Sequence, residues 1–146
     1  SSAEKQKQLN ELLAKSAKFI VANLNAIEKE MYIFAIKQKK EKCLHACQTL
    51  KTVCDILAPY PEPETQYEPR VYPESFKQKV GDPKLLAIVQ QMDAVLALIR
   101  GKVIPIIRLI KSGKISARVS SDVIKINQVL KVYIDSLTTQ AGAAKA

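Results

Sequence analysis

Three cysteines and one histidine are the residues whose types could support metal binding or catalysis. Cys43, His45 and Cys47 lie together in the stretch CLHACQ, and cysteine and histidine are the usual protein ligands of zinc. On a helix Cys43 and Cys47 share a face, whereas the side chain of His45 points about 200° away from that of Cys43. A thiol nucleophile needs a neighbouring base, which this spacing does not provide. We therefore interpret the cysteines as small core residues beside a surface histidine.

No other motif for a catalysed reaction occurs in the sequence. It contains no Gly-rich phosphate loop, no HExxH motif, no paired Glu-x-x-His motif and no nucleophile elbow. We expect a protein that is not an enzyme and that has no metal site and no cofactor.

Basic side chains are the second group that could support binding, since the chain has a net charge of +9. Residues 100–125 contain seven basic residues and one acid, Asp122, which gives a local net charge of +6. Residues 37–42 contain four lysines and one acid, which adds +3. Residues 62–82 contain five acids and three basic residues, a net charge of −2. The positive charge is therefore concentrated in two short segments.

These two segments would meet if consecutive long helices alternate in direction. The first and third connections then lie at one end of the molecule, and the acidic residues 62–82 lie at the other. The residues that we expect to bind a partner at this basic end are Lys37, Lys39, Lys40, Lys42, Arg108, Lys111, Lys114 and Arg118. The alternative is a solvated surface in which lysines complement a helix C-terminus, which explains Lys111 and Lys114 but not Arg118 or Lys125.

The charge pattern favours a protein-interaction adaptor that binds an acidic or amphipathic helical segment through the basic end or a groove between helices. Nucleic acid and an anionic membrane surface are the alternatives. Nucleic acid is disfavoured because the basic segments carry few aromatic residues for stacking and no recognition-helix motif. Ile106, Ile107 and Ile115 would help a membrane contact, in which each basic residue contributes about 1 kcal/mol.

The first 58 residues contain no glycine or proline and are permissive for helix. Their apolar residues follow helical spacing in two phases, separated by the polar residues 37–42. The chain therefore either turns there, giving helices over 4–36 and 42–58, or continues as one long helix; we favour the turn. The two stripes are Ile20, Leu24, Ile27, Met31 and Phe34, and Cys43, Cys47, Leu50, Cys54 and Leu57.

Five prolines within residues 59–73 predict an extended crossover over 59–82, because proline lacks an amide hydrogen and restricts the preceding residue. Tyr60, Tyr67 and Tyr72 predict that this crossover lies against the helices. A ligand for an SH3 or WW domain is the alternative, but no basic-flanked PxxP motif occurs.

The second half predicts two further helices, over 83–112 and 116–139. Asp82 and Pro83 form a helix start, Pro105 predicts a kink, and Gly113 ends the first of these helices. Residues 140–146 are expected to form a flexible tail. The stripes are Val89, Met92, Leu96, Ile99, Val103, Ile106 and Ile110, and Val119, Val123, Ile126, Leu130, Tyr133 and Leu137.

Together these patterns predict an all-α domain over 1–146, an antiparallel four-helix bundle with up-down-up-down order and a long Pro-rich crossover between the second and third long helices. An odd number of cysteines on one helix favours reduced thiols, and so a cytoplasmic or nuclear location. The sequence opens with no signal-peptide pattern, and its longest apolar run is interrupted by polar residues, so we expect no transmembrane segment.

Overall fold

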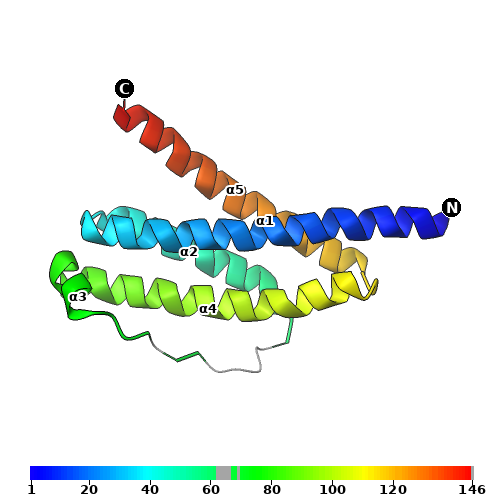
Figure 1. The fold of residues 1–146 in the computed structure, drawn as a ribbon, viewed down its shortest axis with the longest axis horizontal. Coiled ribbons are helices and arrows are strands. Elements are labelled where there is room, and N and C mark those ends of the chain that lie inside the picture. Colours follow the sequence, from blue (N-terminus) through cyan, green and yellow to red (C-terminus); the bar gives the residue numbers. More distant parts are fainter. Residues whose placement is uncertain (62–66, 69, 146) are drawn as a thin grey trace.

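The structure is a computed structural model that describes residues 1–61, 67, 68 and 70–145, with side chains described as far as residue 137. Within these residues every regular element is an α-helix, so the predicted all-α class is confirmed (Figure 1). The five helices are α1 (Ser2–Ile36), α2 (Lys40–Leu57), α3 (Glu74–Val80), α4 (Pro83–Lys111) and α5 (Ala117–Lys145).

The four long helices enclose one hydrophobic core. Both α4 and α5 pack against α1 and also against α2. The predicted apolar stripes form this core, and Leu24, Leu96 and Leu130 are completely buried. Two members of the stripes, Cys54 and Leu137, are only half-buried. Helical periodicity therefore identified the buried face of each long helix.

The chain turns between α1 and α2, as the change of phase predicted, without a glycine or a proline. Gln38 adopts a left-handed conformation with φ of 56°. This conformation costs about 1–2 kcal/mol for a residue with a Cβ. The amide of Lys39 donates a hydrogen bond of 2.8 Å to the carbonyl of Phe34, which closes the end of α1.

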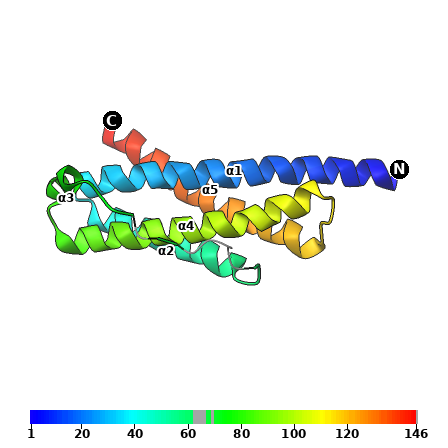
Figure 2. The ribbon, with the colours of Figure 1, turned by 60° about the horizontal axis from the view of Figure 1, so that its bottom comes forward.

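The direction of the helices differs from the predicted order. Figures 1 and 2 show that α2 and α4 run in the same direction and that α1 and α5 run in the opposite direction. The up-down-up-down prediction is therefore wrong. The physical reason is the length of the crossover, because residues 58–73 can reach about 50 Å, whereas α2 is about 27 Å long. The α3 helix and the start of α4 lie at the end of the molecule where α2 began (Figure 1).

The predicted crossover over 59–82 contains a helix that the sequence reading missed. α3 packs on α1 and α4, and its Val80 is buried. Phe76 of α3 stacks on Tyr72 at 5.3 Å between ring centroids and contacts Tyr32 of α1 edge-to-face at 5.4 Å. Tyr72 is buried and Tyr60 half-buried, whereas Tyr67 is exposed, so two of the three crossover tyrosines pack against the helices.

The ends of α4 follow the sequence signals. The side chain of Asp82 accepts a hydrogen bond of 2.9 Å from the amide of Lys84. The helix continues through Pro105, and its yellow C-terminal part is inclined to the green part in Figures 1 and 2. Gly113, with φ of 72°, forms the turn into α5.

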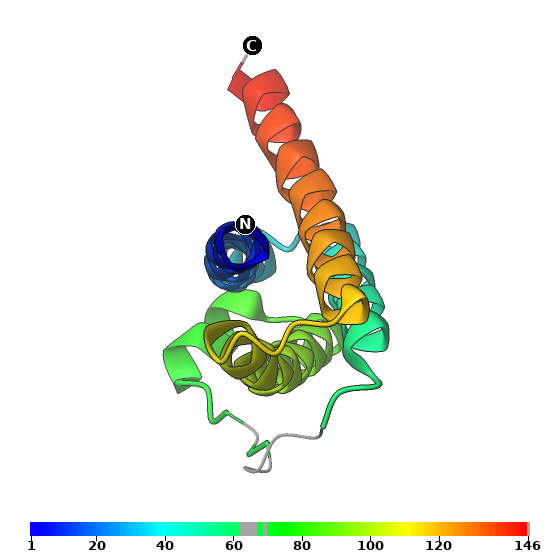
Figure 3. The same cartoon turned by 90° about the vertical axis from the view of Figure 1, so that its right-hand side faces the viewer.

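The last helix is longer than predicted. α5 continues to Lys145, so the predicted end at 139 and the tail over 140–146 are corrected as far as the described residues extend. Figures 1 and 3 show that the red C-terminal part of α5 diverges from α1 and extends clear of the other helices.

Candidate functional site

The two basic segments lie at opposite ends of the molecule, so the predicted joint basic end does not exist. The amide nitrogen of the Gln38 side chain lies 4.0 Å from the position of a Cβ on Gly81, next to the start of α4. The corresponding position on Gly113, in the turn between α4 and α5, lies 3.5 Å from the Asn10 side chain near the start of α1. The reason is the parallel course of α2 and α4 (Figure 2). Asp82, at the end of the acidic segment, lies at the end of the molecule that holds the α1–α2 turn, and Glu62 and Glu64 lie outside the described residues.

The lysines of the α1–α2 turn project into solvent. Lys37, Lys39 and Lys40 are exposed. Lys42 is half-buried, and its ammonium nitrogen lies 5.4 Å from the centroid of the Phe34 ring, a cation–π distance.

The basic residues near the α4–α5 turn are partly neutralised. Arg108, Lys111 and Lys114 are exposed. Arg118 lies 3.9 Å from Asp122, one turn along α5. The carboxylate of Asp122 also accepts a 3.0 Å hydrogen bond from Tyr60, and burial together with this bond raises the pKa of Tyr60 to about 12. Because Arg118 is paired with Asp122, fewer unpaired basic side chains are available at this end than the sequence count indicates.

The candidate site is a seam on the surface where α1 lies against α4. Residues of α1 with 4-3-4-3-4 spacing face residues of α4 along it, and the seam has a polar half and an apolar half. The α1 residues are Ala14, Lys18, Val21, Asn25, Glu28 and Tyr32, and the α4 residues are Asp93, Arg100, Ile107 and Lys111.

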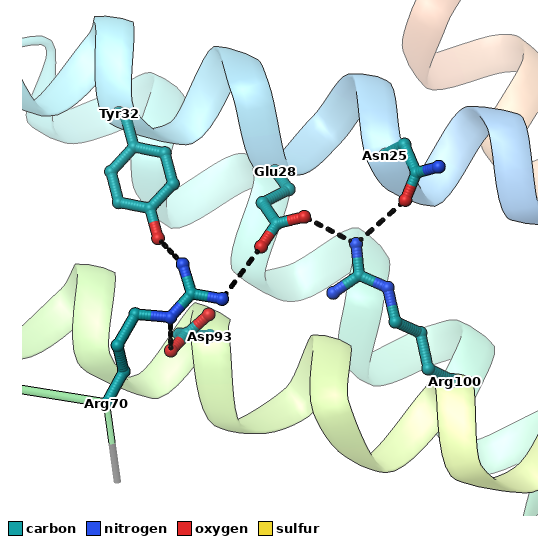
Figure 4. A network of polar contacts seen from close by, with 6 residues as sticks. All are labelled: Asn25, Glu28, Tyr32, Arg70, Asp93 and Arg100. Carbon is teal, nitrogen blue, oxygen red and sulfur yellow. Dashed lines mark hydrogen bonds and ion pairs between the residues drawn. The ribbon is translucent and has the colours of Figure 1, made fainter.

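The crossover closes the polar half of the seam through Arg70 (Figure 4). Its guanidinium lies 3.2 Å from Glu28 and 3.5 Å from Asp93, and it donates a hydrogen bond to the hydroxyl of Tyr32. The Asp93 side chain is only 5% exposed, so loss of Arg70 would leave a buried carboxylate without this cation. Burial is the largest cause of a raised pKa of Tyr32.

A second arginine joins the same network. Arg100 of α4 lies 2.6 Å from Glu28 and donates a 3.0 Å hydrogen bond to Asn25. Glu28 therefore pairs with two arginines, one from α4 and one from the crossover (Figure 4). The network links α1, α4 and the crossover by side chains alone.

The apolar half of the seam is an open groove with a volume of about 310 Å³. Ala14 and Ala17 of α1 leave space that larger side chains would fill, opposite Ile107 and Ile110 of α4. Lys18 of α1 and Lys111 of α4 lie in the walls. The complete lining is Ala14, Ala17, Lys18, Val21, Ile107, Ile110 and Lys111. Lys111 is the predicted site residue that this groove includes.

A second, wider groove of about 430 Å³ lies between α2 and α5. The ring of His45 packs against that of Tyr133 at 5.3 Å between centroids, with an angle of 38° between the planes. Val132 is 70% exposed beside them. The lining contains no lysine, arginine, aspartate or glutamate and consists of His45, Thr49, Gln128, Val129, Val132, Tyr133 and Ser136.

The cysteines occupy the positions that helical spacing predicted. Cys43 and Cys47 are buried with free thiols, and His45 is exposed on another face of α2. Burial raises the pKa of Cys43 to about 11 and also raises that of Cys47. Within the described residues, no group of three or more His, Cys, Asp or Glu side chains is arranged to hold a metal ion.

The sequence patterns did not predict the Arg70 network. One signal could have indicated it: Asp93 follows Met92 directly in an apolar stripe, and a carboxylate so near the core needs a partner. The sequence does not identify that partner, because Arg70 is separated from Asp93 by a turn, a short helix and a loop. Helical spacing alone cannot place a residue of an extended segment.

Comparison with known proteins gives no relative. No family model matches the chain. No curated protein matches it, and no solved structure matches its fold. Across the residues that the structure describes, none of the helices combines the length and the apolar character needed to span a bilayer.

Proposed function

We propose that the chain is a non-catalytic protein-interaction domain that binds an acidic, amphipathic helical segment of another protein in the α1–α4 groove. In this proposal α1, α2, α4 and α5 act as a four-helix bundle that supports the groove. The observation that carries the proposal is an apolar groove with a lysine in each wall, Lys18 on α1 and Lys111 on α4. A cytoplasmic or nuclear location, which suits the free cysteines, belongs to the same proposal.

The dimensions of the groove suit a short helix. Its α1 wall extends from Ala14 to Val21, which is about 10 Å along the helix axis. A helix that presents apolar side chains at positions i, i+3 or i+4, and i+7 covers the same length. Two or three apolar side chains of the partner would fill the space above Ala14 and Ala17.

The charges in the walls select an acidic partner. A helix that lies between α1 and α4 places its flanking residues beside Lys18 on one side and Lys111 on the other. Glutamate or aspartate at these flanking positions would pair with both lysines, as residues beside a coiled-coil seam do. Arg108 and Lys114 add positive charge nearby and would increase the association rate.

The crossover supports this reading by covering the other half of the seam. Arg70 lies there between Glu28 and Asp93, so a basic residue of the crossover pairs with the two carboxylates of the polar half. The uncovered half has the opposite charge and an apolar floor. An acidic amphipathic segment is the complement of that half.

The test is fluorescence anisotropy with a labelled helical peptide that has three apolar residues on one face and glutamates on both flanks. Ala14→Leu fills the groove, and we expect it to weaken binding by about tenfold or more. Ala87→Leu, on the exposed outer face of α4, is the matched control and should bind normally. Equal binding by both variants would contradict the groove as the site.

A charge-reversed pair tests the role of the lysines. Lys18→Glu with Lys111→Glu should weaken peptide binding, whereas Lys51→Glu with Lys131→Glu changes the net charge equally on other surfaces and should not. Competition with duplex DNA and with phosphatidylserine vesicles separates the alternatives. Tight binding of DNA or vesicles that Lys18→Glu with Lys111→Glu abolishes, combined with no peptide binding, would replace the proposal by that alternative.

A further inference from the structure

The outer face of α5 carries a stripe of exposed residues whose positions are symmetric about Leu130 and whose two end residues carry opposite charges. Lys125, Gln128, Val132 and Asp135 follow 3-4-3 spacing, so they lie on one side of the helix, and all four are exposed. Along the sequence, Lys125 and Asp135 are each five residues from Leu130, and Gln128 and Val132 are each two residues from it. A basic residue at one end thus corresponds to an acidic residue at the other.

We propose that a second copy of this chain binds here, with its α5 antiparallel to the first about a twofold axis at the level of Leu130. In that arrangement Lys125 of each copy faces Asp135 of the other, and Val132 of each copy lies beside Gln128 of the other. A twofold interface uses the same surface on both copies, so a self-complementary stripe is what it requires.

The groove between α2 and α5 provides the apolar part of this contact. It lies along the stripe, and Val132, at 70% exposure, projects beside the hollow of about 430 Å³. Val132 of one copy would enter the hollow that His45, Thr49 and Tyr133 of the other copy line. A projecting apolar side chain next to a hollow on the same surface fits an isologous contact.

Charge also favours this surface over others for contact between identical chains. With a net charge of +9, two copies repel each other wherever lysines face lysines. The lining of the α2–α5 groove contains no lysine, arginine, aspartate or glutamate. The α1–α4 groove, with a lysine in each wall, would be repulsive between copies.

The position of α5 adds a structural reason. Its C-terminal part extends clear of the other helices (Figure 3). Most of the stability of a helix in water comes from packing of one face rather than from its own propensity. An antiparallel second α5 would supply that packing for both copies.

The test is the mass of the chain by sedimentation equilibrium over a wide range of protein concentration. We expect a dimer that dissociates on dilution. Lys125→Glu or Asp135→Lys alone converts both symmetric pairs into like-charge pairs and should weaken the dimer by about tenfold or more. The combined variant Lys125→Glu with Asp135→Lys restores opposite charges and should dimerise as the original chain does.

Two further variants separate dimerisation from folding. Val132→Glu should give a folded monomer, because this side chain is exposed. Its helical CD spectrum and melting temperature should equal those of the original chain at concentrations where the original chain is also monomeric. Lys51→Glu, at an exposed position of α2 outside the groove lining, makes the same charge change as Lys125→Glu and is the matched control that should remain dimeric. A monomer at every concentration, or single charge variants that dimerise normally, would overturn the proposal. So would a charge-swapped double variant that stays monomeric. Peptide binding in the α1–α4 groove should be the same in all of these variants.

Discussion

The substitution Arg70→Ala tests whether the crossover is fastened to the helices by its side-chain contacts. Arg70 is the crossover residue whose guanidinium lies between Glu28 of α1 and Asp93 of α4. Removal of this guanidinium leaves Glu28 with Arg100 at 2.6 Å. Asp93 instead loses a cation at 3.5 Å, although its side chain is only 5% exposed.

The expected loss follows from these exposures. Removal of one partner from a buried ion pair costs about 3–5 kcal/mol, whereas an exposed pair contributes about 0–1 kcal/mol. Asp93 is buried but the Arg70 side chain is 48% exposed, so the pair lies between these limits. We expect Arg70→Ala to lower the free energy of unfolding by about 2 kcal/mol.

The assay is urea unfolding followed by CD, with Arg118→Ala as the matched control. Arg118 is 63% exposed and lies 3.9 Å from Asp122, so its loss should cost about 0.5 kcal/mol. A double-mutant cycle with Asp93→Asn measures the coupling between Arg70 and Asp93 directly. Equal losses for Arg70→Ala and Arg118→Ala, or no coupling to Asp93, would refute the role of the network.

Three further predictions concern the core. Leu130→Asp should unfold the protein, because it places a charge in a completely buried position; an unchanged CD melting curve would contradict this. Thiol reagents should modify the half-buried Cys54 first and reach the buried Cys43 and Cys47 only on unfolding, as mass spectrometry with and without urea will report. The contribution of the neutral Cys43 thiol to the free energy of unfolding should be complete below pH 9.0 and be lost between there and about pH 11. The reason is that the Cys43 thiol ionises at the lower value in the unfolded chain and at the higher one in the folded protein, and Cys43→Ala should flatten this dependence.

The sequence predicted helices better than it predicted their directions. Apolar residues with 3-4 spacing must face a core, so the pattern alone predicted which side of each long helix is buried. The direction of α4 depends on how far the crossover extends before the chain turns, and an extended segment carries no periodicity that reports its course. The two lysine-rich segments were therefore assigned to one end by topology, and topology was the part that the sequence did not determine.

The candidate groove could be predicted from the sequence only in part. Helix–helix grooves were expected to bind a partner, and Lys111 was among the expected residues. The hollow itself arises because Ala14 and Ala17 lie opposite Ile107 and Ile110, which requires the register between α1 and α4. That register is fixed by contacts such as Arg100 with Glu28, which join residues far apart in the sequence.

The long connection between α2 and α3 has a consequence for a divided chain. A cut there would separate α1 and α2 from α3, α4 and α5, yet both α4 and α5 pack against both α1 and α2. Almost all of the core would then lie between the two fragments rather than within either one. The nicked protein should therefore behave as a tight complex of two complementary fragments whose stability depends on their concentration, and each fragment alone should be unable to fold.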